Sequence, residues 1–235
     1  MIKNKKHIFF DLDRTIWDFD KNAKETIFEL YDDLELRKKG IDSPLIFFEA
    51  YEKINDWCWY EYRIGRLAKH ELRTIRFEKT LEEFFITDVV LADRLGTNYL
   101  KICPLKKNLI KDAHFVLSSL VKKYTLHIIT NGFNEIQHIK LQTCDLKKYF
   151  SEIITSERAK SKKPFKAIFD FSLQLTNANI EESVMIGDDY EADINGASLI
   201  GMDSIWFNEK GQKKSPLKNS REIKSLKELL PMFLD

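Results

Sequence analysis

Two aspartates near the amino end of the chain, Asp11 and Asp13, occupy alternate positions directly after the apolar run Ile8-Phe9-Phe10. Two carboxylates this close repel each other unless a cation or a shared proton lies between them. Such a pair can bind a hard cation, and its members can act as a nucleophile or as an acid and base. The same pattern also fits a strand that ends in a polar loop, so other residues must support a functional site.

Three further groups of polar residues could complete a site with this pair. Asp188 adds a carboxylate for Mg2+, which binds oxygen ligands, keeps several waters and usually bridges to a phosphate. Thr130 and the backbone amides that follow it suit phosphate oxygens, and the ammonium of Lys163 adds a positive charge for the same oxygens. The three groups are Thr130-Asn131-Gly132, Lys163-Pro164 and Gly187-Asp188-Asp189, the last followed by Asp193.

This set of side chains is suited to phosphoryl transfer. The Asp11 carboxylate can accept the phosphoryl group and form an aspartyl-phosphate. Asp13 can protonate the leaving alkoxide and then deprotonate the water that hydrolyses the intermediate. A bound cation and Lys163 would balance the charge on the transferring group, which is the source of most phosphoryl-transfer catalysis.

Short apolar runs precede the polar groups and predict strands that are buried on both faces. Helical periodicity between them predicts right-handed βαβ units and a parallel sheet, with helices over about residues 108–121 and 165–175. Because the carboxyl ends of parallel strands meet at one edge of a sheet, we expect the polar groups to share one cleft. The predicted strands cover residues 7–10, 124–129, 152–155, 183–186 and 203–207.

Residues 16–100 differ from the rest of the chain because they show only helical periodicity. Apolar residues such as Ala23 and Ile27 recur there at three- and four-residue intervals, and glycine and proline are confined to the breaks. The sequence therefore predicts an α/β fold with a doubly wound parallel sheet, formed by residues 1–15 and 101–235. In this prediction residues 16–100 form an inserted α-helical cap domain.

Composition and charge restrict the classes of function. Lys+Arg 38 against Asp+Glu 37 gives a net charge of +1, without the basic excess typical of proteins that bind nucleic-acid polymers or membrane surfaces. The chain contains no apolar run of the roughly 18 residues that a transmembrane helix needs. Its three cysteines lack a CxxC spacing and indicate free thiols in a reducing compartment. We expect a cytoplasmic monomer or weak homodimer whose partner is neither nucleic acid nor membrane.

The four groups, in this order, resemble the four motifs of the haloacid dehalogenase superfamily of phosphohydrolases. All of them fall at predicted strand ends, and together they span the chain. The helical insertion is similar to the first class of cap in that superfamily, and the predicted sheet is similar to its Rossmann-like core. The matching segments are Asp11-Leu12-Asp13-Arg14-Thr15, Ile129-Thr130-Asn131-Gly132, Lys163-Pro164 and Gly187-Asp188-Asp189-Tyr190-Glu191-Ala192-Asp193.

This resemblance implies roles for individual residues. Asp11 would be the nucleophile and a Mg2+ ligand, and Asp13 the acid and base that also binds Mg2+ through its backbone carbonyl. Asp188 would be the remaining carboxylate ligand, supplemented by Asp189 or Asp193. Phosphate would be held by Thr130, Asn131 and Lys163, the lysine of the cluster Lys160, Lys162 and Lys163 that a proline follows.

One motif position departs from the pattern of the superfamily. Arg14 stands where a small or polar residue is often found, and it could contact substrate or point to solvent.

A finer resemblance points to the pyrimidine 5'-nucleotidase branch of the superfamily, whose members dephosphorylate nucleoside monophosphates. It implies a nucleoside 5'-monophosphate, preferably a pyrimidine one, as the small phosphomonoester substrate. The aromatic residues of the second predicted helix are expected to pack in a core or between domains and not to form a platform for base stacking. They are Trp57, Trp59, Tyr60 and Tyr62. The segments that carry this resemblance are Trp59-Tyr60-Glu61-Tyr62-Arg63-Ile64-Gly65, Arg76-Phe77-Glu78, Thr130-Asn131-Gly132-Phe133 and Trp206-Phe207-Asn208.

Two other functions remain open at this point. The same site could serve a phosphatase for small sugar- or acid-phosphates. The fold could also belong to a non-catalytic regulator that binds nucleotide or phosphate, because a fold does not determine a function. A dehalogenase fits less well, since Asp13 would have no leaving alkoxide to protonate.

Overall fold

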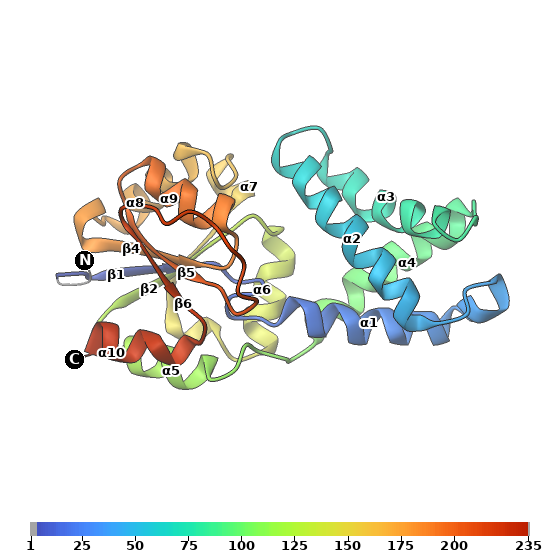
Figure 1. Ribbon diagram of the computed structural model, residues 1–235, viewed down its shortest axis with the longest axis horizontal. Helices are drawn as coiled ribbons and strands as arrows, with labels where there is room; N and C mark the ends of the chain where they lie inside the picture. Colours follow the sequence, from blue (N-terminus) through green and yellow to red (C-terminus); the bar gives the residue numbers. More distant parts are fainter. Residues whose placement is uncertain (1–3, 235) are drawn as a thin grey trace. The chain divides into compact units, whose positions relative to one another are not determined.

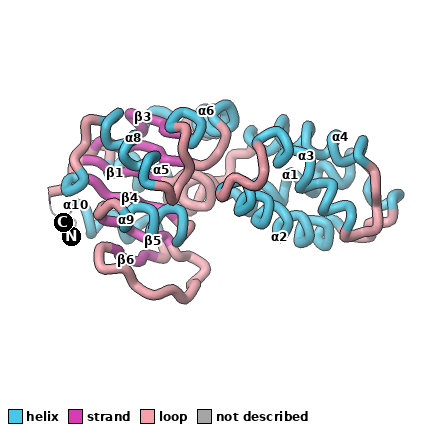
Figure 2. Tube along the Cα trace, turned by 90° about the horizontal axis from the view of Figure 1, so that it is seen from above, coloured by secondary structure: helices cyan, strands magenta, loops and turns pink. Residues whose placement is uncertain are grey.

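A computed structural model describes residues 4–234 of the chain. Its packing forms two compact units, one made of the chain up to Phe19 and from Lys107 onward, the other of Asp20–Lys106. All strands of the described residues belong to the first unit, whereas the second contains helices and loops (Figures 1 and 2). The domains expected from the sequence, with boundaries after residues 15 and 100, and the role of the helical part as a cap remain predictions.

Six parallel strands form one sheet with the order β3-β2-β1-β4-β5-β6. The order reverses between β1 and β4, and such a switch point is where open α/β sheets bind their ligands. The predicted α/β fold with a doubly wound parallel sheet is therefore confirmed. The strands are β1 His7–Phe10, β2 Thr125–Thr130, β3 Phe150–Thr155, β4 Ser183–Gly187, β5 Asp203–Phe207 and β6 Ser220–Ile223.

The register of the central strands places the polar groups that follow them side by side at the carboxyl edge of the sheet. Phe10 at the end of β1 lies opposite Ile128 of β2 and Ile186 of β4. The next backbone amide, that of Asp11, donates a hydrogen bond to the carbonyl of Ile186 at 2.8 Å. Asp11 consequently leaves the sheet between the ends of the two neighbouring strands.

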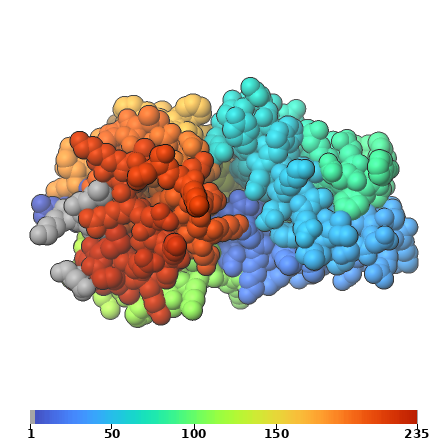
Figure 3. Space-filling model, viewed as in Figure 1, coloured from blue at the N-terminus to red at the C-terminus, as the bar shows by residue number. Residues whose placement is uncertain are grey.

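Helices cover both faces of the sheet. Figure 1 shows α8 (Lys166–Thr176) and α9 (Gly196–Leu199) on one face, and α5 (Ala113–Leu120) and α10 (Leu229–Leu234) on the other. On the face that Figure 3 shows, orange and red segments from late in the chain form most of the surface of the first unit, and little of the blue region near the start of the chain is visible. This agrees with the burial of all three β1 residues from Ile8 to Phe10. Two further helices, α6 (Asn134–Thr143) and α7 (Ser156–Ala159), follow β2 and β3.

Two parts of this unit differ from the sequence-based prediction. The helix expected from residue 108 begins only at Ala113, because Leu109 forms a bridge with Trp17 and the amide of Ile110 donates to the carbonyl of Ile16 at 2.9 Å. The edge strand β6 was not predicted. Only one of its four residues, Ile223, is buried, so it lacks the apolar run that marks the other strands.

The second unit is built from four helices, α1 (Phe19–Asp33), α2 (Pro44–Arg63), α3 (Lys69–Glu82) and α4 (Val89–Ile102). Ser43 and Asp88 cap α2 and α4, since their side chains accept hydrogen bonds from backbone amides of the first turn. Among the α2 aromatics expected to pack, Tyr62 is buried. Trp57 and Tyr60 are 45% and 48% exposed, so neither packs in the core of this unit, and their packing between domains stays a prediction. None of the helices in residues 4–234 has the length and apolar character needed to span a membrane.

A buried histidine in β2 leads to a prediction on stability. His127 stacks on Phe9, and its Nε2 lies 3.1 Å from Nδ1 of His7. Burial, and secondarily the neighbouring His7, lowers the pKa of His127 from 6.5 to about 4. The unfolded chain therefore binds more protons than the folded one below about pH 6.5. The contribution of the neutral imidazole to stability is complete above that pH and is lost as the pH falls towards 4.

We expect the free energy of unfolding to fall by about 2 kcal/mol from this group between pH 7 and pH 5, and His127→Leu to remove that part of the slope. Urea unfolding at both pH values measures it. The exposed His138 provides the matched control, because His138→Leu should leave the slope unchanged. An identical slope in His127→Leu and the wild type would contradict the prediction.

Candidate active site

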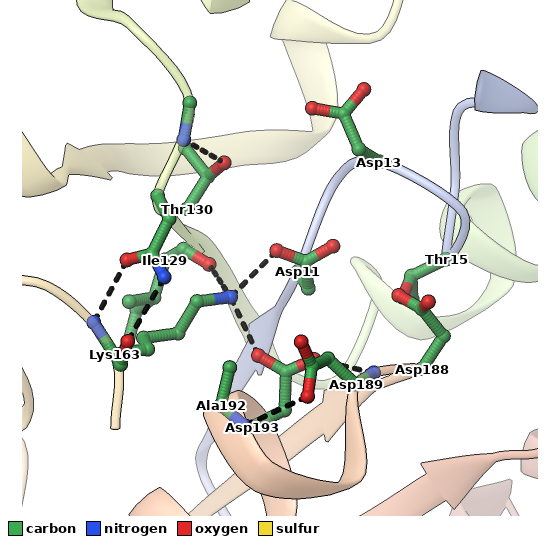
Figure 4. Close-up of polar contacts among 12 residues, drawn as sticks. Asp11, Asp13, Thr15, Ile129, Thr130, Lys163, Asp188, Asp189, Ala192 and Asp193 are labelled. Atoms are coloured by element: carbon green, nitrogen blue, oxygen red, sulfur yellow. Dashed lines mark hydrogen bonds and ion pairs between the residues drawn. The ribbon is translucent and has the colours of Figure 1, made fainter. Parts of the chain in front are cut away.

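Asp11 and Lys163 form a buried ion pair at the carboxyl edge of the sheet (Figure 4). The Lys163 ammonium donates to Oδ1 of Asp11 at 2.6 Å, to Oδ1 of Asp193 at 2.6 Å and to the carbonyl of Ile129 at 2.8 Å. Its three protons are thus all used. Burial alone would lower the pKa of Lys163, but the charges of Asp11 and Asp193 raise it above its usual value. Lys163 therefore stays a cation and links the first, third and fourth polar groups.

Asn131 fixes the loop that carries this lysine. Its side-chain oxygen accepts a hydrogen bond from the backbone amide of Lys163 at 2.8 Å, and its Nδ2 donates to the carbonyl of Lys163 at 3.0 Å. Thr130 is buried, and its hydroxyl oxygen accepts a hydrogen bond from the amide of Gly132 at 3.0 Å. The phosphate contacts expected of Thr130, Asn131 and Lys163 remain predictions, and the observed bonds give Asn131 a positioning role as well.

Three carboxylates converge next to Lys163. Asp11, Asp188 and Asp193 each place one oxygen within 4.8 Å of the others. A side chain at Gly187 would prevent this, because a Cβ there would lie 2.1 Å from Oδ2 of Asp193. Thr15 donates a hydrogen bond from its hydroxyl to Oδ1 of Asp188 at 3.0 Å and so orients that carboxylate.

The electrostatics of this cluster fit a hard cation. Burial raises the pKa of Asp188 well above its usual value, and the charges of Asp11 and Asp193 raise it further. Burial also raises the pKa values of Asp11 and Asp193, although Lys163 offsets part of both shifts. The Lys163 ammonium thus pairs with the buried Asp11 and Asp193, and the half-buried Asp188 adds a third carboxylate to the cluster. An additional cation with a preference for oxygen ligands would relieve their repulsion, and Mg2+ has that preference.

The structure distinguishes the two carboxylates that the sequence left as alternatives. Asp193 belongs to the cluster of three. Asp189 instead caps the short helix of π geometry at Tyr190–Asn195, and its Oδ1 accepts hydrogen bonds from the amides of Glu191 at 3.0 Å and Ala192 at 2.9 Å. Arg14, whose role the sequence left open, lies with its guanidinium carbon 4.8 Å from the ring centroid of Phe19.

Asp13 lies apart from the cluster, and Figure 4 shows its carboxylate turned away from Asp11. It is held by two side chains of α6, Lys140 and Gln137, at 2.5 Å and 2.9 Å. Neither residue was predicted from the sequence to belong to the site. The sequence does contain one indication of their role. Gln137 and Lys140 lie three residues apart on the helix that follows the Thr130-Asn131-Gly132 group, so they share one helix face. Their spacing alone, however, does not show that this face is buried.

Comparison with known proteins agrees with this geometry. A family profile described as haloacid dehalogenase-like hydrolase matches residues 41–207, more than half of the chain. The chain belongs to this family. The superfamily resemblance noted in the sequence is thereby confirmed.

Individual haloacid dehalogenase-like proteins extend the comparison. The chain is 30% identical to the pyrimidine 5'-nucleotidase YjjG of Escherichia coli, over 86% of this chain and 85% of YjjG. It is 28% identical to the pyrimidine 5'-nucleotidase PynA of Streptococcus pneumoniae, over 86% and 84% of the two chains. A crystal structure of the putative HAD-hydrolase YfnB of Bacillus subtilis, bound to magnesium, matches with a TM-score of 0.88 and 28% identity over 98% of this chain and 99% of YfnB. The protein is therefore a hydrolase and a phosphatase of the haloacid dehalogenase-like family.

Proposed function

We propose that the protein is a Mg2+-dependent phosphomonoesterase that acts through an aspartyl-phosphate on nucleoside 5'-monophosphates, with pyrimidine nucleotides preferred. The convergence of Asp11, Lys163 and two further carboxylates at the switch point of the sheet carries this proposal. The nucleotide substrate is supported by the similarity to two enzymes that are named pyrimidine 5'-nucleotidases.

The ion pair at the end of β1 prepares Asp11 for nucleophilic attack. Lys163 binds one carboxylate oxygen, Oδ1, and so orients the other. That oxygen attacks the phosphorus, the bond from phosphorus to the ester oxygen breaks, and Asp13 gives its proton to the leaving alkoxide. In the second half-reaction Asp13, now a carboxylate, takes a proton from water and becomes the acid again. The water oxygen bonds to phosphorus, the bond from phosphorus to the Asp11 oxygen breaks, and inorganic phosphate departs, so that Asp11 is again a carboxylate.

The residues that would hold Mg2+ are Asp11, Asp188 and the backbone carbonyl of Asp13, with Asp193 beside them. When bound, the ion neutralises charge on the transferring phosphoryl group and on the carboxylates. Lys163 contributes a second, permanent positive charge to the same region. Thr130, at the end of β2, is proposed to donate its hydroxyl proton to a phosphate oxygen.

Phosphate release from a panel of nucleoside monophosphates, sugar phosphates and acid phosphates tests this proposal, with Mg2+ and with a metal chelator. We expect uridine or thymidine monophosphate to be hydrolysed fastest. Chelation should abolish the activity, because the buried carboxylates then repel the phosphate, and added Mg2+ should restore it. A circular dichroism spectrum in chelator serves as the control for folding.

Each other outcome removes one part of the proposal. Release from sugar or acid phosphates alone would replace the nucleotide substrate and keep the mechanism. Full activity in chelator would remove the metal. Absence of release from every ester would favour the regulator that binds phosphate without hydrolysing it.

A further inference from the structure

Both carboxylate oxygens of Asp13 are bound by side chains of α6. Oδ1 lies 2.5 Å from the ammonium of Lys140, and Oδ2 accepts a hydrogen bond from Nε2 of Gln137 at 2.9 Å. Gln137 is 1% exposed and Lys140 5% exposed. The Asp13 side chain, by contrast, is 27% exposed. Two buried donors thus bind the carboxylate on one side, and its other side is accessible to solvent.

Lys140 is an unusual residue for a buried helix face. A lysine loses its hydration when it is buried, and this is costly unless a counter-charge compensates it. Here the counter-charge is Asp13, and the ammonium also lies 4.2 Å from the ring centroid of Trp17. An apolar residue would fill the same space at lower cost to stability, so packing alone does not account for a lysine here.

Gln137 reaches Asp13 across Gly132. A Cβ on Gly132 would lie 1.6 Å from Nε2 of Gln137, which is impossible without displacing that side chain. Gly132 is not among the residues with positive φ, so the glycine is needed for this close approach and not for its backbone angles. Oε1 of Gln137 is buried and has no hydrogen-bond partner in the described part of the chain, which is itself unfavourable. The amide is therefore kept in place chiefly by its bond to Asp13.

We infer that Lys140 and Gln137 are positioning residues for the acid and base of the reaction, and that Gly132 provides the space in which Gln137 can act. They hold the Asp13 carboxylate in one direction, so that it can meet the leaving oxygen in the first half-reaction and water in the second. This inference rests on the proposed function of Asp13. It also connects two motifs, because Gly132 belongs to the second and Asp13 to the first.

A comparison of kcat/KM between substrates with different leaving groups tests whether Asp13 is correctly placed. An alkoxide needs a proton as it leaves, whereas p-nitrophenolate leaves readily without one. The ratio kcat/KM reports the steps up to the first phosphoryl transfer and excludes the later hydrolysis of the aspartyl-phosphate. Misplacement of Asp13 should therefore lower kcat/KM for alkyl phosphates and affect p-nitrophenyl phosphate much less.

The experiment measures kcat and KM of Lys140→Met, Gln137→Met and Gly132→Ala with uridine 5'-monophosphate, glycerol phosphate and p-nitrophenyl phosphate. We expect kcat/KM to fall about tenfold to hundredfold for the alkyl phosphates and by less than about threefold for p-nitrophenyl phosphate. KM should change little for the alkyl phosphates, because the phosphate contacts are intact, whereas for p-nitrophenyl phosphate kcat and KM should fall together if hydrolysis of the aspartyl-phosphate slows. Lys140→Arg, which keeps a donor for Asp13, should recover part of the loss.

Lys148→Met is the matched control. It also breaks a lysine–aspartate ion pair, that of Lys148 with Asp145, but both side chains are exposed, and it should leave every kinetic constant unchanged. Urea unfolding of each variant shows whether the fold is kept, and Gln137→Met and Gly132→Ala test the inference if Lys140→Met does not fold.

An equal loss for alkyl and aryl phosphates, or no loss for either, would overturn the positioning role. Asp13→Asn separates this failure from failure of the proposed function. If Asp13→Asn retains full activity on alkyl phosphates, Asp13 is not the acid and base. If it is inactive while the α6 variants behave as the wild type, only the positioning role is wrong.

Discussion

Asp11→Asn is expected to abolish phosphate release, with a loss of at least about ten-thousandfold in kcat, while the protein stays folded. A carboxamide oxygen is too weak a nucleophile to form the acyl-phosphate bond. The substitution keeps the size of the side chain and an oxygen that can accept from Lys163. Burial raises the pKa of Asp11 despite Lys163, so the fold disfavours the ionised form, and a neutral amide should leave the free energy of unfolding unchanged or higher.

The measurement combines phosphate release, urea unfolding and trapping of labelled phosphate on the protein. The wild type should retain label on Asp11 after rapid denaturation, and the variant should not. Mass spectrometry controls for deamidation of the new asparagine, which would restore the aspartate. Turnover at the wild-type rate by an intact Asp11→Asn variant would refute the nucleophile assignment.

Lys163→Met has the second largest expected effect, on activity and on stability together. It removes the ammonium that binds Asp11 and Asp193, and so leaves these two buried carboxylates without the cation that pairs with them. We expect kcat to fall about a hundredfold to a thousandfold, as for loss of other charge-stabilising donors, and the free energy of unfolding to fall by about 3 kcal/mol.

A second substitution separates the two effects. The double variant Lys163→Met/Asp193→Asn carries one carboxylate fewer, so it should regain much of the lost stability without regaining activity. Lys166→Met is the control, since the ion pair of Lys166 with Asp170 is exposed and its loss should change neither quantity. Activity that returns with stability in the double variant would show that Lys163 serves the fold alone.

The elements that carry the site were predictable because their signals are local. A strand buried on both faces has a run of mostly apolar residues, and β1, β2 and β4 all show one, interrupted in β2 by His127. The end of such a run marks the point where a chain leaves the sheet, and parallel strands leave it at a common edge. For this reason the sequence alone predicts that Asp11, Lys163 and Asp188 meet at one edge of the sheet, although their roles in catalysis remain proposals.

Prediction failed where the deciding contacts are not local. The late start of α5 depends on the hydrogen bond from the amide of Ile110 to the carbonyl of Ile16, two residues that are distant in sequence. The edge strand β6 exists because β5 offers it hydrogen bonds, and its exposed residues carry no apolar pattern.

The sequence by itself thus determined the fold class and the family, because the four motifs, their order and their positions at the ends of predicted strands can be recognised from the residues alone. Only the tertiary structure placed Asp193 beside Asp11 and Asp188, and Asp189 at the start of the short helix, where its carboxylate caps backbone amides. Only the tertiary structure, likewise, joined Asp13 to Lys140 and Gln137. These pairs depend on how a helix packs beside a separate strand, and no local pattern of residues encodes that packing.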